Sequence, residues 1–471
     1  MQIDDLRSYL AALEARGQLH RVTAPIDRDL ELGHVAVLGE RSGGPALLFE
    51  NVTGFQIPVL TSALTTTERL AVVLGEEPGP GIPELSRFWV QRLASGLKPP
   101  EAVDKAPLLE NVLTGSEIDV TRLPSPKLYP EDGGRFFGTT AYLVVRDPES
   151  GWINLGVYRM QELAPDRVAV QILRGKHADM ILDHYRERGE AMPAAAIMGG
   201  DPLLFLAASS FIGHGVSEYD VVGALRGRPV EVWHSDLSGL PLPARAEIVL
   251  EGVIDPAETC REGPLGEYTG YYSFEDWQKP MLKVERVLHR DDPIFWACTV
   301  GKPVNDIHML QSLARTASLW NDLAEQRIPG IESVYVPPEA CGWFWIVVSL
   351  RQMYAGHSAQ AAAAVLASSS GHHGTKGVII VDHDIAPDDW AGIWWALSTR
   401  FDAARSVRVE SGRSSQLDPS LPAGVRTTTG RVVLDACVPF EWADKPREVK
   451  LDTDTEARVR ARWSEFGLPP L

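Results

Sequence analysis

The amino-acid sequence predicts a mixed α/β (α+β) protein made of consecutive parts. Three observations predict this class. An amphipathic helix and scattered apolar runs fill residues 1–110, many short β-like runs fill 111–304, and helical and strand patterns alternate over 305–450. A final helical pattern lies in 451–471. At 471 residues, the chain is long enough for about three domains of roughly 150 residues.

The N-terminal part begins with a helix predicted over residues 4–16. Leu6, Leu10 and Leu13 recur at helical spacing with charged residues between them. Short apolar runs and a second helical stretch, residues 67–74, follow. The next segment is EEPGPGIPEL, whose glycines and prolines predict a loop. We expect this part to form a small α/β cap.

The central part contains short strand-like runs separated by turn residues. These runs are TAYLVVRD, WINLGVYRMQ, RVAVQILRG, RPVEVWHS, AEIVLEGVI, MLKVERVLH and PIFWACTVG. Only two helical stretches interrupt them, ADMILDHYRERGE and PLLFLAASSF. This pattern predicts a largely antiparallel sheet or barrel rather than a doubly wound fold.

The C-terminal part alternates helix and strand. The order is MLQSLARTASLWNDLAEQ, CGWFWIVVSL, AQAAAAVLASS, GVIIVDHDI and DDWAGIWWALSTRF, which predicts an α/β domain. The last predicted helix, residues 454–466, follows a polar linker and is a candidate for docking on another subunit.

The composition narrows the class of function. The chain has 45 basic and 63 acidic residues, and its net charge of −18 argues against a nucleic-acid partner. Four widely spaced cysteines without a CxxC pair predict reduced thiols, not a disulfide framework or a zinc site. Neither a secretory signal nor a run of 18 apolar residues is present, so we expect a cytoplasmic protein that acts on a small molecule.

Three polar residues form a candidate metal site. Asn154 lies in WINLGVYRMQ, His177 in ILRGKHADM and Glu218 in GVSEYD. Oxygen and nitrogen ligands of these types suit a divalent cation such as Mg²⁺ or Mn²⁺. Each residue alone has an ordinary structural explanation, as a strand-edge residue, a helix cap or a surface group. Their combination favours the metal site.

Arg159, Glu262 and Glu267 form a candidate acid–base group. The glycines and the proline of EGPLGEYTGYY exclude a regular helix, so a turn can bring both glutamates together. Two close carboxylates raise one another's pKa, which leaves one able to act as an acid near neutral pH. A solvated acidic hairpin is the alternative.

The odd separation of Asn154 and Arg159 places them on opposite faces of a regular strand. If both residues serve one site, the strand must bend between them.

The chain resembles the UbiD-type family of decarboxylases and carboxylases over most of its length. In order, the matching runs are GGRFFGTTAYLVV, INLGVYRMQ, GKHADMI, GVSEYDVVGALRG, ARAEIVLEGVI, EGPLGEYTGYY and GTKGVIIVDHDI. The resemblance implies an N-terminal α/β cap (1–110), a central split β-barrel that binds prenylated FMN (111–304), a C-terminal α/β dimerisation domain (305–450) and a C-terminal tail (451–471). It also implies a dimer-based homo-oligomer and a separate flavin prenyltransferase that supplies the cofactor.

The resemblance also implies residue roles. Asn154, His177 and Glu218 would bind Mn²⁺ or Mg²⁺ at the flavin phosphate, with K⁺ beside it near the carbonyls of residues 207–209. Glu267 would donate a proton within the Arg159, Glu262 and Glu267 network. The residues that the resemblance assigns to cofactor binding are Asn154, Arg159, Lys176, His177, Glu218 and Lys376.

The implied reaction is the reversible, non-oxidative decarboxylation of an aromatic or heteroaromatic acid through a covalent adduct with prenylated FMN. Hydroxybenzoate, indole-, pyrrole- and furan-carboxylate types are all compatible. Lys176 replaces a glutamine of cinnamic-acid-type relatives, which argues against an acrylic substrate, and Lys302, His308 and Leu310 fall where relatives line the substrate pocket. Two alternatives stay open: an FMN-dependent oxidoreductase on a split barrel, and a non-catalytic subunit of a carboxylase complex.

Overall fold

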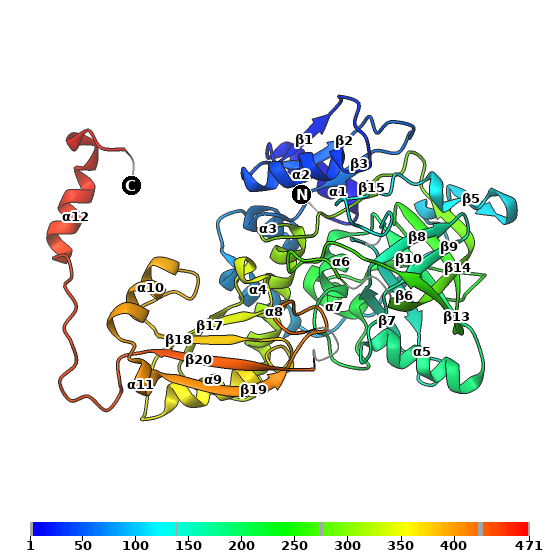
Figure 1. The fold of residues 1–471 in the computed structure, drawn as a ribbon. Coiled ribbons are helices and arrows are strands. Elements are labelled where there is room, and N and C mark those ends of the chain that lie inside the picture. Colours follow the sequence, from blue (N-terminus) through cyan, green and yellow to red (C-terminus); the bar gives the residue numbers. More distant parts are fainter. Residues whose placement is uncertain (1–2, 138, 274–276, 423–426, 470–471) are drawn as a thin grey trace.

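The computed structural model describes residues 3–137, 139–273, 277–422 and 427–469, without the side chain of Trp277. It confirms the mixed α/β class. Figure 1 shows the N-terminal elements at the top, the central sheet on the right and the C-terminal sheet at the lower left. Each region contains its own sheet, and helices lie between the regions.

The N-terminal region is a small sheet with helices packed against it. Its elements are α1 (Leu6–Ala15), β1 (Leu19–Val22), α2 (Glu31–Arg41), β2 (Ala46–Phe49), β3 (Val59–Thr61), α3 (Thr67–Leu74) and α4 (Ile82–Leu93). The sheet order is β1-β2-β3-β15, and β15 (Phe295–Trp296) pairs in parallel with β3. The strand expected from PIFWACTVG is therefore short, and it belongs to the N-terminal sheet.

Both helices predicted in the N-terminal region are confirmed by α1 and α3. The loop predicted for EEPGPGIPEL is wrong from Ile82, where α4 begins. Pro83 lies in the first turn of α4, where a helix needs no backbone N–H donor. The Glu84 side chain accepts a hydrogen bond from the Gly81 N–H at 3.1 Å, which satisfies a backbone donor at the start of the helix.

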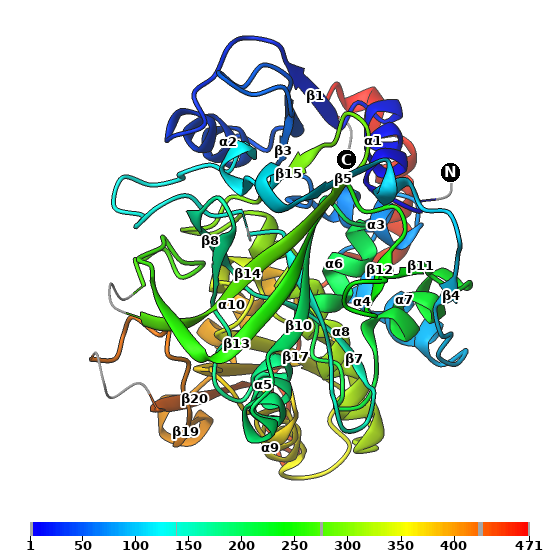
Figure 2. The ribbon, with the colours of Figure 1, turned by 90° about the vertical axis from the view of Figure 1, so that its right-hand side faces the viewer.

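The central region is built on a large sheet of order β7-β6-β10-β13-β14-β9-β8, to which β5 adds beside β14. Figure 2 shows β13 and β14 as two long, twisted strands that cross the view diagonally. Among the described strands the sheet is open, so the expected barrel does not close. Its strands are β5 (Asn111–Thr114), β6 (Tyr142–Arg146), β7 (Ile153–Val157), β8 (Met160–Ala164), β9 (Arg167–Val170), β10 (Met192–Met198), β13 (Ile248–Glu262) and β14 (Trp277–His289).

Helices and a second, small sheet accompany the large central sheet. The two helices expected from the sequence are α5 (His177–Arg188) and α6 (Pro202–Ala208), and a third, α7 (Glu218–Arg226), was not predicted. Nearly every residue of α7 is buried, so it lacks the polar face that marks a surface helix. The small sheet has the order β12-β11-β4 and consists of β4 (Glu101–Ala102), β11 (Glu231–His234) and β12 (Pro241–Pro243).

The C-terminal region confirms the predicted alternation of helices and strands. Its sheet order is β16-β17-β18-β20-β19, and β17, β18 and β20 run parallel. Side chains at alternate positions of β17 and β18 pack either with α8 and α9 or with α10. The elements are α8 (Asp306–Glu325), β16 (Ile331–Tyr335), β17 (Trp345–Leu350), α9 (His357–Ala367), β18 (Gly377–Asp382), α10 (Trp390–Thr399), α11 (Ala403–Ser406), β19 (Val407–Arg413) and β20 (Thr428–Ala436).

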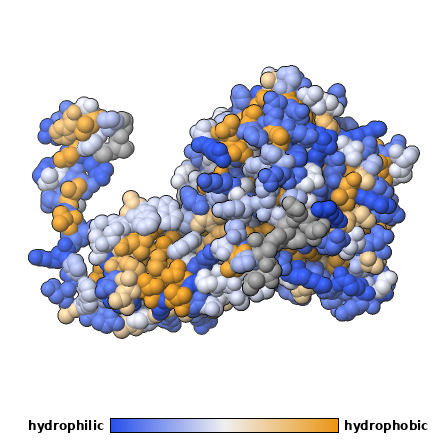
Figure 3. All heavy atoms as spheres, in the orientation of Figure 1, coloured by the Kyte–Doolittle hydropathy of each residue, from blue (hydrophilic) through white to orange (hydrophobic). Residues whose placement is uncertain are grey.

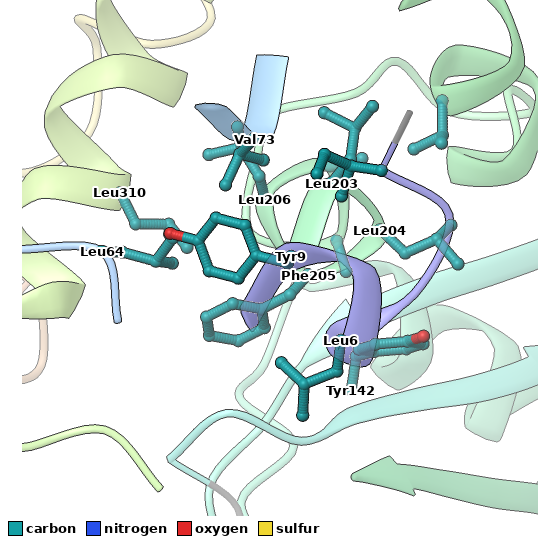
Figure 4. Close-up of a cluster of buried hydrophobic side chains, with 14 of the residues drawn as sticks. Leu6, Tyr9, Leu64, Val73, Tyr142, Leu203, Leu204, Phe205, Leu206 and Leu310 are labelled. Carbon is teal, nitrogen blue, oxygen red and sulfur yellow. The ribbon is translucent and has the colours of Figure 1, made fainter. Parts of the chain in front are cut away.

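The largest hydrophobic core crosses the boundaries between regions. Figure 4 shows Leu6 and Tyr9 of α1 packed with side chains of α6, and Leu310 of α8 beside Leu64. The fully buried hydroxyl of Tyr9 donates to the Ala63 carbonyl at 2.6 Å. This shared core attaches α8 to the N-terminal and central regions, although α8 also packs under the C-terminal sheet.

The C-terminal tail stands apart from the rest of the chain. Figure 1 shows α12 (Thr453–Ala461) at the end of an extended segment. No side chain of α12 is buried, and a short 3₁₀ turn, Trp463–Phe466, follows it, close to the predicted range 454–466. In the part of the chain that the structure describes, every helix is too short or too polar to cross a membrane.

Candidate active site

The structure brings together the side chains of Asn154, His177 and Glu218, which come from three different elements. Asn154 lies within β7, whereas His177 and Glu218 are the first residues of α5 and α7. The Asn154 Nδ2 atom donates to Glu218 Oε1 at 2.9 Å and lies 3.5 Å from His177 Nδ1. The Leu155 N–H donates to Glu218 Oε2 at 2.6 Å, which fixes the carboxylate against the strand.

Burial gives this group electrostatics that suit a cation. Burial raises the pKa of Glu218 to about 8, because the described surroundings supply hydrogen bonds but no positive charge sufficient to offset it. Burial also lowers the pKa of His177, and His214 and Lys176 add to this effect. The imidazole is therefore neutral near neutral pH, the form that binds metal ions.

The donor set fits a hard or borderline divalent cation. Asn154 Oδ1 is buried and accepts no hydrogen bond from any described residue, so one oxygen is available for a metal. Two helices begin at this group, and helix N-termini favour anions such as phosphate. Within the described residues, no cluster of three or more His, Cys, Asp and Glu side chains is arranged to hold a metal ion. This group has two such residues, and the amide oxygen of Asn154 is the candidate third ligand.

His214, which the sequence did not single out, lies beside the candidate metal group. Its ring centroid is 4.7 Å from that of Trp152 and 6.1 Å from that of His177, and Trp152 contacts the edge of the His177 ring at 4.9 Å. A lone histidine in the loop FIGHGVSE carries no periodic signal. Only the fold shows that this loop returns to the start of α5.

A second polar group consists of Arg159, Glu262 and Glu267, all of which are buried. Arg159 donates from Nε to Glu262 Oε1 at 2.7 Å and from Nη2 to Glu262 Oε2 at 2.8 Å, so this pair is bidentate. Arg159 Nη1 donates to Glu267 Oε1. The guanidinium thus joins both carboxyl groups. The sequence led us to expect that the turn would bring these two glutamates together.

The turn between the two glutamates is held by side chains from elsewhere. Gln161 accepts a hydrogen bond from the Gly263 N–H at 2.9 Å, and Asp132 accepts one from the Gly266 N–H at 2.8 Å. A Cβ atom at Gly133 would lie 2.1 Å from the Gly263 carbonyl oxygen, so the close approach of these two backbones requires glycine. These contacts direct Glu267 back toward Arg159.

Ser273 completes the group and was not identified from the sequence. Arg159 Nη2 donates to Ser273 Oγ at 3.1 Å, and the same oxygen accepts from the Leu265 N–H at 3.0 Å. A serine after GEYTGYY has no distinctive sequence pattern. Its role becomes visible because the chain folds back between Gly266 and Tyr272, which form an isolated antiparallel bridge.

Glu267 is the carboxyl group best placed to carry a proton. Burial raises its pKa, Arg159 opposes this effect, and the nearby Glu262 raises the pKa further. One arginine neutralises one carboxylate, and Glu262 receives two of its hydrogen bonds. The second carboxyl group is therefore stabilised in its protonated form.

Asn154 and Arg159 do not lie on one continuous strand. β7 ends at Val157 and β8 begins at Met160, so Tyr158 and Arg159 form a break between the two strands. The Tyr158 hydroxyl accepts a hydrogen bond from the Ala178 N–H at 3.3 Å, which ties this break to the start of α5. Because the strand is interrupted between the two residues, strict alternation of one strand does not place their side chains on opposite faces.

A cavity of about 220 Å³ opens at Glu267. The central region supplies one wall and residues near Leu417 of the C-terminal region supply the other. Glu267 is 7% exposed, so its carboxyl group is buried but reachable from this side. The lining residues are Glu267, Thr269, Tyr271, Tyr272, Ser273, Leu417 and Pro419.

The two predicted cofactor lysines lie at the interface between the central and C-terminal regions. Lys376 Nζ donates to Asp418 Oδ1 at 2.7 Å and lies 5.3 Å from the centroid of the Phe344 ring. Lys176 precedes α5, and its Nζ lies 5.2 Å from the centroid of the Phe211 ring. Lys176 is therefore held beside an aromatic side chain, immediately before His177.

The three residues expected at the substrate pocket have different surroundings. Lys302 is exposed, and its backbone packs against Gly270 of the loop that follows Glu267. His308 is fully buried: its Nδ1 accepts from the Asn305 N–H at 3.2 Å, so its Nε2 donates to the Tyr268 carbonyl at 2.6 Å. Leu310 is 1% exposed within the largest core and is absent from the lining of the cavity.

Family models match the chain along most of its length. The 3-octaprenyl-4-hydroxybenzoate carboxy-lyase N-terminal domain matches residues 10–89, its Rift-related domain matches 101–303, and its C-terminal domain matches 308–436. Together these spans contain all the candidate site residues described above. The matches follow the chain in the order N-terminal, central and C-terminal.

Solved structures of two enzymes are similar to at least 96% of the chain. Vanillic acid decarboxylase from Sedimentibacter hydroxybenzoicus, in its closed form, is 29% identical, with a TM-score of 0.88 and coverage of 100% of both chains. The UbiD-class enzyme HmfF from Pelotomaculum thermopropionicum, in complex with FMN, is 29% identical, with a TM-score of 0.87 and coverage of 96% of this chain and 98% of that one. An evolved dimeric form of HmfF in complex with prFMN is 28% identical, with a TM-score of 0.83 and the same coverages.

Proposed function

The chain belongs to the UbiD family of prenylated-FMN-dependent carboxy-lyases, and on this premise we propose that it catalyses the reversible, non-oxidative decarboxylation of an aromatic or heteroaromatic carboxylic acid. Hydroxybenzoate, indole-, pyrrole- and furan-carboxylate types remain the substrate candidates. The observation that carries the proposal is the buried group of Arg159, Glu262 and Glu267 at the edge of the cavity. Vanillic acid decarboxylase, a structural relative, acts on an aromatic acid.

We assign the proton transfer to Glu267. Decarboxylation replaces the bond from carbon to the carboxyl group with a bond to hydrogen, so each turnover releases CO₂ and consumes one proton. Glu267 faces the cavity, and its raised pKa keeps it protonated at higher pH than an ordinary carboxyl group. Arg159 orients Glu267 and forms a bidentate ion pair with Glu262.

Asn154, His177 and Glu218 would hold Mn²⁺ or Mg²⁺ at the phosphate of the flavin. The buried carboxylate, the neutral imidazole and the available Asn154 Oδ1 support this assignment. A dication between Glu218 and a phosphate removes the repulsion between two anions. Prenylated FMN, when bound, supplies the electron sink for loss of CO₂. Lys176, Lys376 and Arg159 would contact the cofactor, and a K⁺ ion near residues 207–209 is part of the same proposal.

The identity of the bound flavin tests this function directly. We would co-produce the chain with a flavin prenyltransferase, release the bound small molecule, and record its mass and absorbance spectrum together with the metal content. The expected result is the mass of prenylated FMN with about one Mn²⁺ per flavin, as one metal-bridged phosphate requires. Production without the prenyltransferase is the control and should yield plain FMN.

Two other results would contradict the proposal. Plain FMN without metal in the co-produced protein would favour the FMN-dependent oxidoreductase, which uses a nicotinamide donor and has no need of paired buried glutamates. A protein that binds no flavin would favour the non-catalytic subunit of a carboxylase complex. CO₂ release from aromatic acids by the loaded protein then tests the reaction itself.

We also propose that the chain forms a homodimer, or a larger assembly of dimers, through its C-terminal region. The helix α10 buries only Ile393 and Ala396, whereas Trp394 is 65% exposed and Trp395 is 42% exposed. Figure 3 shows hydrophobic residues gathered on the C-terminal region, below the extended tail. Large exposed apolar side chains in one patch favour a protein interface.

Replacing Trp394 with aspartate is expected to shift the assembly toward the mass of one chain. A charge in a desolvated aromatic contact costs binding energy on the order of 2 kcal/mol or more. Light scattering coupled to size-exclusion chromatography measures the mass. Leu38→Asp is the matched control, because Leu38 of α2 is 63% exposed but lies in the N-terminal region. A wild-type monomer, or an unchanged mass for Trp394→Asp, would contradict this interface.

A further inference from the structure

Arg315 is a buried arginine on α8, and part of its guanidinium group makes no hydrogen bond with the described residues. It is 1% exposed, and its Nη2 donates to the Ser370 carbonyl. Its Nε and Nη1 atoms are buried and donate to no described acceptor. The guanidinium carbon lies 3.9 Å from the centroid of the Trp343 ring and 5.2 Å from that of Phe211. A buried positive charge without a carboxylate partner costs folding free energy unless a ligand neutralises it.

Two further buried groups that can donate hydrogen bonds lack partners among the described residues: the indole N–H of Trp343, whose ring Arg315 contacts, and the hydroxyl of Thr375. A Cβ atom at Gly374, the residue before Thr375, would lie 2.2 Å from Trp343 Nε1, so the indole N–H and this short segment are in contact. The unsatisfied groups of Arg315 and Trp343 are therefore donors, and they require an acceptor.

The charges around Arg315 are also positive. Lys176 Nζ lies 5.2 Å from the centroid of Phe211, the ring that Arg315 also contacts. Arg413 Nη2 would lie 3.8 Å from a Cβ atom at Gly175. The described carboxylates that line the same interface are already engaged, since Glu267 binds Arg159 and Asp418 binds Lys376. An anion would find complementary charge and unused donors here.

This cluster adjoins the proposed proton donor. Tyr268 directly follows Glu267, and its ring centroid lies 6.1 Å from that of Trp343. The Tyr268 carbonyl accepts a hydrogen bond from His308, which lies two helical turns before Arg315 on α8. Tyr268 and Trp343 therefore connect Glu267, which lines the cavity, with Arg315.

We propose that Arg315, with Trp343 and Lys176, binds a second anionic group of the substrate, one that stays on the ring while CO₂ leaves. This inference rests on the proposed function and restricts its substrate class to aromatic acids with two anionic groups, such as dicarboxylic acids. We assign Arg315 to the anionic group that stays on the ring. A fixed cation at the departing carboxylate would stabilise the bound substrate more than the transition state, and would slow the loss of CO₂. The planar guanidinium suits a carboxylate.

Equilibrium binding tests the proposal without turnover. The probes are terephthalate and isophthalate, with 4-hydroxybenzoate and 4-methylbenzoate as monoacids of similar shape, titrated into FMN-loaded protein by calorimetry. We expect the dicarboxylates to bind the wild type more tightly than the monoacids. Arg315→Gln should weaken dicarboxylate binding on the order of 10- to 100-fold and monoacid binding less than about threefold. Arg122→Gln, at an exposed position, is the control for loss of one positive charge.

Arg315→Lys provides a second variant, which keeps the charge but loses the planar fork. It should weaken dicarboxylate binding by an intermediate factor if the fork contributes. Equal affinity of wild type for monoacids and dicarboxylates would overturn the inference, as would unchanged dicarboxylate binding in both Arg315 variants. Loss of FMN from the Arg315 variants, with dicarboxylate binding intact, would assign the cluster to the cofactor phosphate and would also overturn it.

Turnover by protein loaded with prenylated FMN separates this inference from the function on which it rests. We expect the ratio of kcat/KM for dicarboxylate over monoacid to fall about 10- to 100-fold in Arg315→Gln, mainly through KM. CO₂ release from monoacids alone would overturn the inference and leave the proposed function standing. If no acid released CO₂, the proposed function would fail, and the calorimetric result would still decide whether Arg315 binds a second anion.

Discussion

Glu267→Gln is expected to lower the rate of CO₂ release by at least about 100-fold while the flavin stays bound. Glutamine keeps the size of the side chain and its hydrogen bond with Arg159 but has no acidic proton to deliver. The substitution also removes a buried group with a raised pKa, so it should not destabilise the fold. Steady-state CO₂ release and flavin absorbance, measured on one preparation, provide both quantities.

The pH dependence gives a second signature of the proton donor. Burial raises the pKa of Glu267, so the protonated form persists into a higher pH range than for an ordinary carboxyl group. The wild-type rate should therefore fall as pH rises through this raised pKa, and the residual rate of Glu267→Gln should not show that limb. Glu258→Gln is the control, because Glu258 is an exposed glutamate on the same strand β13. A fully active Glu267→Gln enzyme would exclude Glu267 as the donor.

Glu218→Ala is expected to lose the metal and the cofactor together. Glu218 is the only acidic member of the candidate metal group, and hydrogen bonds from Asn154 and Leu155 hold both of its oxygens. Without it, a dication has no anionic protein ligand, and the affinity for Mn²⁺ should drop by more than about 100-fold, since losing an outer partner alone costs 10- to 100-fold. Metal analysis and flavin absorbance of the purified variant measure both losses.

A nearby carboxylate offers a matched comparison for Glu218. Asp220 also lies in the first turn of α7, so Asp220→Ala removes one negative charge from the same helix end. This variant should retain metal and flavin. If Glu218→Ala retained flavin but no metal, the flavin phosphate would bind without the help of a metal ion, contrary to the proposal. Loss of both from Asp220→Ala would point to the helix end instead of the Glu218 carboxylate.

Several elements could be predicted because their signal is local. Leu6, Leu10 and Leu13 repeat at helical spacing, and α1 buries this face. The helix α4 was missed because Pro83 resembles a loop residue, although the first turn of a helix tolerates proline. The helix α7 was missed because burial on nearly all sides removes the polar stripe that periodicity detects. Pairing of β15 with β3 is a contact between distant segments and leaves no local pattern.

The candidate site shows the same contrast between local sequence signals and contacts that depend on the fold. Residue types and motifs were sufficient to single out Asn154, His177 and Glu218, whose side chains lie together in the structure, and the two carboxyl groups that pair with Arg159. They did not show how Arg159 divides its hydrogen bonds between Glu262 and Glu267, on which the proposal that Glu267 donates the proton depends. They also did not show the break between β7 and β8, which separates Asn154 from Arg159.

Short motifs and their order were enough to identify the family, the succession of the three regions and the types of the residues proposed to carry the chemistry. Burial of those groups, which sets their electrostatics, could be seen only in the folded chain. Arg315 illustrates the difference, since its unused donors become apparent only where α8, Trp343 and Phe211 meet. Desolvation and unpaired charge arise from packing between segments far apart in the chain, and no local pattern of residues encodes them.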